Sequence, residues 1–126
     1  MTVLDTDFLI ALGHRRPGAM ARSDHFLEEA MLTRVPAIVW LEFLIGVAPE
    51  QRLRVRARLA GSTTLHPFGS EEAERALDIQ TLLSEAGTPM SWNDLQVAAS
   101  ALVVGEPLVT NDKAFQRVPG LQVEPF

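Results

Sequence analysis

The sequence predicts an α/β fold, built on a mainly parallel sheet of about five strands flanked by helices. Short apolar runs alternate along the chain with longer segments in which apolar residues recur at helical spacing. Strands that alternate with helices pair in parallel through right-handed crossovers. At 126 residues, the chain is long enough for one hydrophobic core but not for two. We therefore expect a single domain over residues 1–126.

The first predicted strand indicates where chemistry is expected. The apolar residues Val3 and Leu4 lead into the acidic turn Asp5-Thr6-Asp7, after which the sequence is apolar again. A buried parallel strand that ends in a carboxylate has this pattern. Ligands of open α/β sheets bind at the carboxyl ends of the strands, so Asp5 is a candidate site residue.

Two helices and a second strand are expected next. A helix over residues 7–12 leads into a turn at residues 13–18, and Ser23 is expected to cap the following helix. A strand is predicted over residues 35–39, followed by a helix that continues through Val47.

Glu42 is the only charged residue in the stretch 35–48. Carboxylates are seldom fully buried unless they are paired or bind a metal. Glu42 therefore either occupies an exposed stripe of its helix or belongs to a site.

Four arginines follow within a few residues: Arg52, Arg54, Arg56 and Arg58. Their alternation with apolar residues fits a strand, whereas Pro49 at a first helical position and the Leu, Ala and Arg content favour a helix. We predict a helix over residues 49–60. Its arginines form either a solvated face or a surface that binds phosphate or a partner.

The third strand is predicted at residues 63–66, and a helix capped by Ser70 is predicted to follow it and to end at Gly87. Its first turn contains two glutamates, which the helix dipole favours. The residues expected to face inward are Ala73, Ala76, Leu77, Gln80 and Leu83.

Asp94 is the only charged residue in the stretch 86–105. The polar residues of this stretch argue against a membrane span. We predict a buried helix over residues 92–104, with Asp94 in its first turn. There Asp94 either caps the helix and stabilises its dipole, or contributes to a site.

Two short strands complete the predicted sheet. Residues 108–110 form the fourth strand, which ends in Asn111-Asp112, and residues 121–123 form the fifth. By itself Asn111-Asp112 is a turn signal. At the end of a parallel strand, however, Asp112 reaches the same sheet edge as Asp5.

Four acidic residues therefore share one property, because each lies within or directly after an apolar run: Asp5, Glu42, Asp94 and Asp112. These positions meet at the carboxyl edge of a parallel sheet. Clustered carboxylates repel one another unless a cation holds them ionised. Oxygen ligands without Cys or His select Mg²⁺ or Mn²⁺ rather than zinc, and such a site supports phosphodiester hydrolysis.

The composition constrains this hypothesis in two ways. The formal net charge is −5, with 16 acidic against 11 basic residues, which by itself argues against a nucleic-acid partner. A bound metal ion reverses the local charge balance, so the argument does not decide the matter. The absence of cysteine excludes disulfides and a cysteine nucleophile and fits a reducing cytoplasm, and the N-terminus lacks a signal-peptide pattern.

Four motifs in order resemble those of the PIN-domain ribonucleases, and among them the VapC-type toxins of bacterial toxin–antitoxin pairs. The matching segments are residues 3–6, 40–47, 93–101 and 109–115, the last followed by 118–121. No single motif is specific, but the ordered set at these spacings is. The resemblance covers nearly the whole chain and implies a three-layer α/β/α fold.

The resemblance also implies a function and roles for individual residues. Asp5, Asp94 and Asp112 would hold Mg²⁺, with Glu42 completing the site directly or through water. Thr6 and Thr110 would orient the carboxylates. The family implies endonucleolytic cleavage of RNA, homodimerisation, and inhibition by a cognate antitoxin. We expect no membrane partner. Two residues depart from the pattern: Ala114 stands where many members have another acid, and Gln96 replaces a common apolar residue.

Two alternatives remain open at the sequence level. Asp5-Thr6-Asp7 after a strand is similar to the nucleophile pair of haloacid-dehalogenase-type phosphatases, although Phe8 follows here instead of the expected Gly-Thr. In that hypothesis Asp7 is essential, whereas in the nuclease hypothesis it only begins a helix. The second alternative is a catalytically silent PIN-like module that binds a partner.

Overall fold

The computed structural model describes residues 1–126 and contains a five-stranded sheet in the order β3-β2-β1-β4-β5. Each of the four neighbouring strand pairs is parallel. The strands are β1 (Thr2–Leu4), β2 (Thr33–Pro36), β3 (Thr64–His66), β4 (Leu108–Val109) and β5 (Val123–Glu124). The predicted α/β class with a parallel sheet is therefore confirmed.

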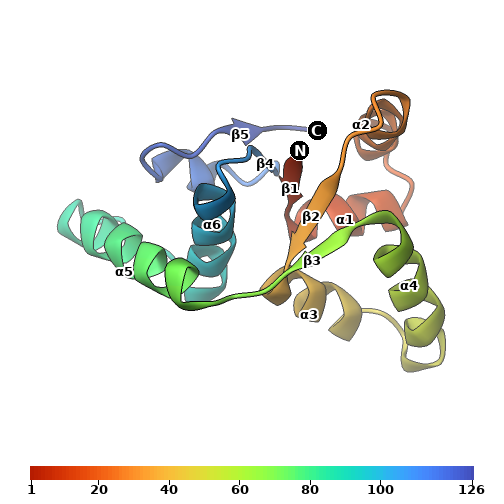
Figure 1. Cartoon of the computed structure of the whole chain (residues 1–126), viewed down its shortest axis with the longest axis horizontal. Helices are drawn as coiled ribbons and strands as arrows, with labels where there is room; N and C mark the ends of the chain where they lie inside the picture. The colour runs from red at the N-terminus through yellow and green to blue at the C-terminus, as the bar shows by residue number, and fades with distance from the viewer.

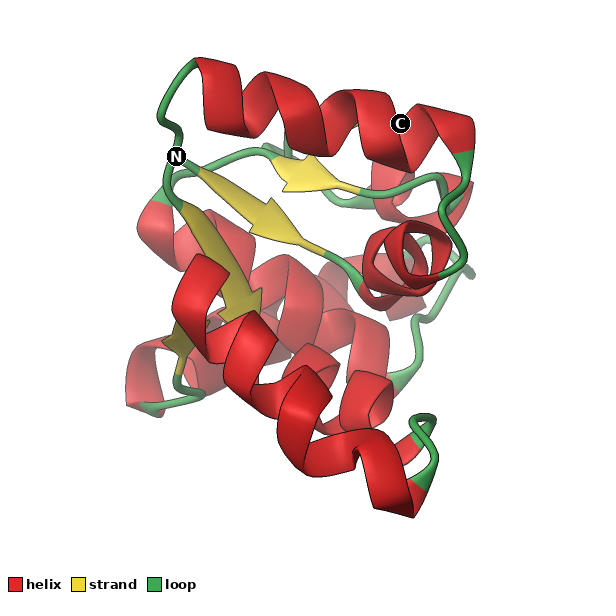
Figure 2. Cartoon of the chain, turned by 90° about the vertical axis from the view of Figure 1, so that its right-hand side faces the viewer, coloured by secondary structure: helices red, strands yellow, loops and turns green.

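Helices cover both faces of this sheet, as the two views in Figures 1 and 2 show. The helices are α1 (Thr6–Gly13), α2 (Pro17–Glu28), α3 (Ala37–Ile45), α4 (Pro49–Ser62), α5 (Ser70–Glu85) and α6 (Trp92–Val104), with a short 3-10 helix at Lys113–Arg117. Helices α1 to α4 lie on one side, and α5 and α6 lie on the other (Figure 1). None of them combines the length and the apolar content that crossing a membrane requires.

The hydrophobic core lies where α6 and α1 pack on the central strands. Val3, Leu108 and Val109 are almost completely buried in β1 and β4. Ala98, Ala99 and Ala101 of α6 are fully buried, and their small side chains allow this helix to approach the sheet closely. The predicted buried helix over residues 92–104 is therefore confirmed with the same boundaries.

Several local predictions were wrong. Helix α2 begins at Pro17 instead of being capped by Ser23, because proline suits a first helical position. Strand β2 ends at Pro36 rather than near residue 39, and α3 begins directly after it.

Helix α5 also differs from its prediction at its start and on its inner face. Gly69 occupies the N-cap position, and Glu72 reaches back to accept a hydrogen bond from the Gly69 backbone N–H (3.1 Å). Ser70 is therefore the first helical residue and not the cap. Leu77 is 61% exposed, whereas Glu72 and Ile79 are buried, so the inner face of α5 is rotated from the predicted one.

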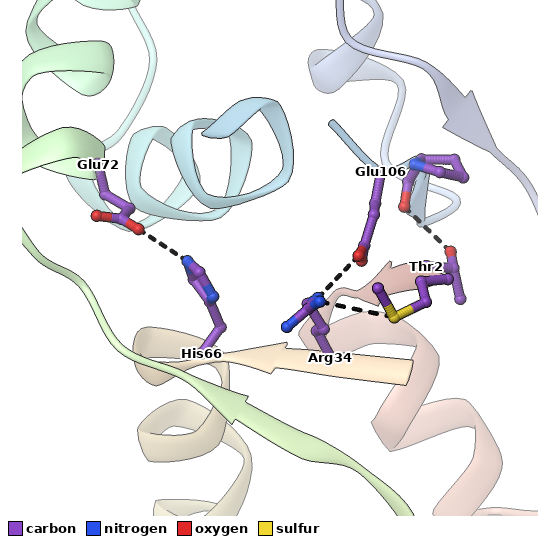
Figure 3. A network of polar contacts seen from close by, with 7 residues as sticks. Thr2, Arg34, His66, Glu72 and Glu106 are labelled. Carbon is purple, nitrogen blue, oxygen red and sulfur yellow. Dashed lines mark hydrogen bonds and ion pairs between the residues drawn. The ribbon is translucent and has the colours of Figure 1, made fainter. Parts of the chain in front are cut away.

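Polar contacts tie the strands β2 and β3 to the α5–α6 side of the sheet (Figure 3). Arg34 donates from Nε to Glu106 Oε1 (2.8 Å), and His66 Nε2 lies 2.8 Å from Glu72 Oε1. The Thr2 hydroxyl donates to the carbonyl of Pro107 (3.0 Å), next to the start of β4. In both ion pairs a buried carboxylate has a basic partner.

The strand order reverses between β1 and β4. From β1 the chain proceeds to β2 and β3 on one side, and it returns through α5 and α6 to β4 and β5 on the other. In open α/β sheets, ligands bind beyond the carboxyl ends of the strands at such a reversal. The residues that follow β1 and β4 are Asp5 and Thr110.

Candidate metal centre

Asp5 lies at the carboxyl end of β1 and is the N-cap of α1. Its Oδ1 accepts a hydrogen bond from the Thr6 backbone N–H (2.8 Å), and its Oδ2 accepts one from the Thr110 hydroxyl (2.8 Å). The side chain is only 8% exposed. Capping fixes the carboxylate between the first strand and its helix, directly at the strand-order reversal.

Asp7, in the first turn of α1, belongs to the same cluster. Its Oδ2 accepts hydrogen bonds from the Asn111 backbone N–H (2.8 Å) and from the Thr110 hydroxyl (3.1 Å). The Thr110 hydroxyl has a single proton, so it donates to Asp5 or to Asp7 at any one moment. Asp7 therefore links α1 to the end of β4 and is more than the helix-start residue that the nuclease hypothesis assumed.

Asp94 and Glu42 approach the edge from helices on opposite faces of the sheet. Asp94 lies in the first turn of α6, whose N-cap is Ser91, with the Asp94 backbone N–H donating to Ser91 Oγ (3.2 Å). Because Ser91 is the cap, the Asp94 side chain is not needed for that role. Glu42 is on α3 and is half-buried, so it does not occupy a fully exposed stripe.

Asp112 follows β4 and is the N-cap of the short 3-10 helix, where its Oδ1 accepts a hydrogen bond from the Ala114 backbone N–H (2.9 Å). Its own backbone N–H donates to Thr110 Oγ1 (3.1 Å). Unlike the other acids of the cluster, Asp112 is exposed.

The electrostatics show that these acids act on one another. Burial is the main cause that raises the pKa of Asp5 from 3.8 to about 6, and the charges of Asp7 and Asp94 contribute. Burial also raises the pKa of Asp7 and of Asp94, in both cases with repulsion from Asp112. The pKa of Glu42 is raised by burial and by Asp94.

None of the five acids forms an ion pair with a basic side chain, since the three ion pairs of the protein involve Glu72, Glu106 and Glu124. Among these five acids, one buried carboxylate oxygen, Asp7 Oδ1, has no hydrogen-bond partner. Four of these carboxylates, those of Asp5, Asp7, Glu42 and Asp94, have a raised pKa and none has a counter-charge, which makes the group a candidate site for a cation.

The donor set fits a hard divalent cation. All the side-chain donors are carboxylate oxygens, with no cysteine or histidine among them, which favours Mg²⁺ or Mn²⁺. In this structure no three of these side chains are close enough together to coordinate one metal ion. Binding a cation therefore requires the carboxylates to move together, and the cation would offset their mutual repulsion.

The structure brings all four sequence-predicted site residues, Asp5, Glu42, Asp94 and Asp112, into one electrostatically coupled group. Thr110 contacts two of the acids through its hydroxyl, as expected of a residue that orients carboxylates. Thr6 orients Asp5 through its backbone N–H.

The nuclease hypothesis gave no site role to Asp7 or to Asn111, although the phosphatase alternative made Asp7 essential. The signal for Asp7 was present, because a second acid two residues after a strand-ending carboxylate remains near the same edge. The Asn111 side chain forms two hydrogen bonds with the backbone of Phe126, and this contact has no local signal in the sequence.

The four arginines lie on a helix, α4, and not on a strand. They differ in their contacts. Arg52 donates from Nε to the Leu44 carbonyl (2.8 Å) and from its terminal nitrogen to the Val47 carbonyl (3.1 Å). It thus satisfies carbonyls at the end of α3. Arg54 and Arg58 are exposed.

The sequence matches known proteins along nearly its whole length. Residues 2–121 match the family model of the PIN domain. A ribonuclease VapC of Rickettsia bellii (strain RML369-C) is 30% identical over 129 aligned positions, which cover 96% of this chain and 92% of that protein. The chain is a PIN domain of the VapC type.

Solved structures share the fold of this PIN domain. VapBC2 from Rickettsia felis, bound to a DNA fragment from its promoter, superposes with a TM-score of 0.87 at 22% identity and covers 99% of this chain and 98% of that one. VapBC-1 from nontypeable Haemophilus influenzae gives a TM-score of 0.82 at 25% identity, with 98% and 96% covered. The similarity extends over the complete α/β/α arrangement.

Proposed function

We propose that this PIN domain is a magnesium-dependent endoribonuclease and the toxin of a toxin–antitoxin pair. The observation that supports this most directly is the group of five coupled carboxylates, without a basic partner, at the strand-order reversal. The VapC relative is named a ribonuclease, which makes RNA the proposed substrate. Membership in the PIN family also displaces the phosphatase alternative built on Asp5 and Asp7.

In this proposal Asp5, Asp94 and Asp112 hold the metal ion, and Glu42 completes the site directly or through water. When bound, Mg²⁺ supplies activation of water and neutralisation of phosphate charge for phosphodiester hydrolysis. Thr110 holds Asp5 in place through its hydroxyl. Asp7 holds the backbone that leads to Asp112. Mn²⁺ has the same ligand preference and would replace Mg²⁺.

The test is cleavage of a mixed tRNA pool by purified protein with Mg²⁺. We expect discrete fragments from the wild type, none from Asp94→Asn, and unchanged cleavage by Asp78→Asn, which removes an exposed acid of α5. In parallel, Mg²⁺ should raise the melting temperature of the wild type, since it binds the native state. Equal cleavage by wild type and Asp94→Asn would show contamination or a wrong site. Absence of both cleavage and stabilisation would identify a silent binding module.

An apolar groove between α3 and α4 supports the proposed antitoxin partner. It has a volume of about 410 Å³ and is lined by Trp40, Leu41, Leu44, Ile45, Arg52, Leu53 and Arg56. Leu53 is 71% exposed and Ile45 is 64% exposed. Two arginines beside an apolar surface, on a chain of net charge −5, match an amphipathic segment with acidic residues at its margin.

Co-expression with the cognate antitoxin tests this partner. We expect Leu53→Asp to abolish co-purification, whereas Leu27→Asp, at an equally exposed leucine of α2, should retain the complex. Light scattering on the free toxin tests the proposed homodimer. If Leu53→Asp instead converts a dimer into a monomer and keeps the antitoxin, the groove is the face between two copies.

A further inference from the structure

The side chain of Asn111 is paired with the backbone of Phe126. Its Nδ2 donates to the Phe126 carbonyl oxygen (3.0 Å), and its Oδ1 accepts from the Phe126 backbone N–H (2.9 Å). The amide thus forms the two hydrogen bonds that a peptide group of a neighbouring strand would form. It extends the backbone pairing of β4 with β5, in which the Thr110 N–H donates to the Glu124 carbonyl (3.0 Å).

The backbone of Asn111 is held from the opposite direction. Its N–H donates to Asp7 Oδ2 (2.8 Å), and the next residue, Asp112, donates its N–H to Thr110 Oγ1 (3.1 Å). Asn111 therefore connects Phe126 to Asp7 and directly precedes Asp112. Because Asp112 is the exposed acid of the cluster, hydrogen bonds rather than packing set its position: these backbone contacts and the bond that its Oδ1 accepts from the Ala114 N–H.

Phe126 is itself fixed by contacts from two helices. Its ring packs edge-on against Phe8 of α1 with 5.1 Å between ring centroids, and Phe8 adjoins Asp7. A Cβ atom built on Gly18 of α2 would lie 3.0 Å from the Phe126 carbonyl carbon. Arg22 of α2 forms an ion pair with Glu124. We call residues 124–126 the C-terminal strap.

We propose that Asn111 is a positioning residue through which the C-terminal strap sets the position of Asp112 and thereby the affinity of the site for Mg²⁺. The inference rests on the proposed function. It adds that the C-terminal strap, which is distant in the sequence from most of the acids, influences how tightly the same site binds Mg²⁺. Without the strap, the turn at residues 111–112 gains conformational freedom. That freedom must be lost again when Asp112 engages the cation, which weakens binding.

Asn111→Ala removes both hydrogen bonds to Phe126 while leaving every acid in place. Ordering one residue opposes binding by an amount equivalent to about a tenfold change in affinity. We therefore expect the Mg²⁺ concentration for half-maximal thermal stabilisation, and for half-maximal cleavage, to rise about tenfold. Cleavage at saturating Mg²⁺ should remain near that of the wild type.

Gly18→Ala provides a perturbation from outside the site. The added methyl group requires Phe126 to shift by a few tenths of an ångström, although alanine is otherwise favourable in a helix. We expect a rise of about threefold in the Mg²⁺ midpoint, less than for Asn111→Ala because the hydrogen bonds weaken without being lost. Gly61→Ala is the matched control, since its Cβ would meet nothing within 4 Å on α4.

Four outcomes separate the possibilities. A Mg²⁺ midpoint for Asn111→Ala equal to that of the wild type overturns the inference. A lower melting temperature with an unchanged midpoint also overturns it, because Asn111 would then be structural only. If the wild type neither binds Mg²⁺ by calorimetry nor cleaves RNA, the proposed function fails. If the wild type does both, but Gly18→Ala and Gly61→Ala have the same Mg²⁺ midpoint, only the role of the strap is refuted.

Discussion

The carboxylates of this PIN domain occupy two contrasting environments. Between the sheet and α5–α6, Glu106 and Glu72 each lie within 2.8 Å of a basic partner, Arg34 and His66 (Figure 3). At the carboxyl edge of the same sheet, Asp5 has other acids as its charged neighbours. Asp5, Glu72 and the side chain of Glu106 are all buried, so burial alone does not distinguish the two environments.

The pKa values of Glu72 and Asp5, one acid from each environment, change in opposite directions. Burial raises the pKa of Glu72, but hydrogen bonds from its own backbone N–H, His66 and the Gly69 N–H outweigh burial and lower it. For Asp5, two hydrogen bonds do not offset burial and repulsion, and the pKa rises to about 6. Paired acids stabilise the fold, whereas unpaired acids oppose folding and are retained where a ligand compensates them.

The largest effect is expected from neutralising an unpaired acid. Asp5→Asn should reduce RNA cleavage at least 100-fold, because a metal ligand contributes several kcal/mol to stabilising the charge of the transition state. Without Mg²⁺ at pH 7, the same variant should be more stable by up to about 3 kcal/mol, because a pKa raised from 3.8 to about 6 measures the cost of ionising Asp5. Urea unfolding in EDTA measures this change. A variant that is less stable than the wild type would contradict the repulsive cluster.

The opposite result is expected when a paired acid loses its partner. Arg34→Met leaves Glu106, whose side chain is 8% exposed, without its counter-charge. We expect a loss of about 2–3 kcal/mol in the free energy of unfolding, near the lower end for buried pairs because Arg34 is partly exposed. Arg34→Met/Glu106→Gln should recover most of that loss. RNA cleavage at 25 °C should remain that of the wild type, since neither residue contacts the cluster.

A smaller effect is expected at the second pair. Glu72→Ala removes the contact with His66 and the hydrogen bond that caps α5 at Gly69. Loss of a cap of this kind costs about 1–2 kcal/mol. The control Glu74→Ala removes an exposed glutamate from the same helix and should be nearly neutral. Equal melting temperatures for the two variants would show that neither the cap nor the contact with His66 contributes to stability.

Sequence patterns predicted the parallel sheet because buried strands have local signals. Solitary acids gave candidates for its carboxyl edge, and their role as a site stays a prediction. Asp5, Glu42, Asp94 and Asp112 each interrupt an apolar run, and the structure places them in one coupled group. Helix starts were predicted less well. At Gly69 the cap comes from Glu72, three residues later, and a glycine gives no side-chain signal for it.

Contacts between distant segments could not be predicted from local patterns. Asn111 and Phe126 are 15 residues apart, and their pairing depends on how β5 adds to the sheet. The same holds for Arg34 and Glu106, which are separated by 72 residues. An alternating or helical pattern specifies which face a residue occupies, not which distant side chain it meets.

The smallest effect is expected from pH, and it separates the two groups of acids directly. Because the folded-state pKa of Asp5 is raised, the native state binds a proton that the unfolded state does not bind between pH 3.8 and about 6. In EDTA, the titration of Asp5 alone should therefore increase stability by about 1 kcal/mol as the pH falls from 7 to 5. The gain should be smaller by that amount in Asp5→Asn, where the raised pKa values of Asp7, Asp94 and Glu42 still contribute. Glu72 acts in the opposite direction only below its ordinary value of 4.5, since its pKa is lowered.

Magnesium should reverse the sign of this pH dependence. The cation competes with the proton for Asp5, so the stabilisation by Mg²⁺ should be larger at pH 7 than at pH 5. Melting curves at both pH values, with saturating Mg²⁺ and with EDTA, give the four values required. Arg34→Met should retain the full difference, because its defect lies in the paired group. If Mg²⁺ stabilises equally at both pH values, Asp5 is not among the groups that hold it.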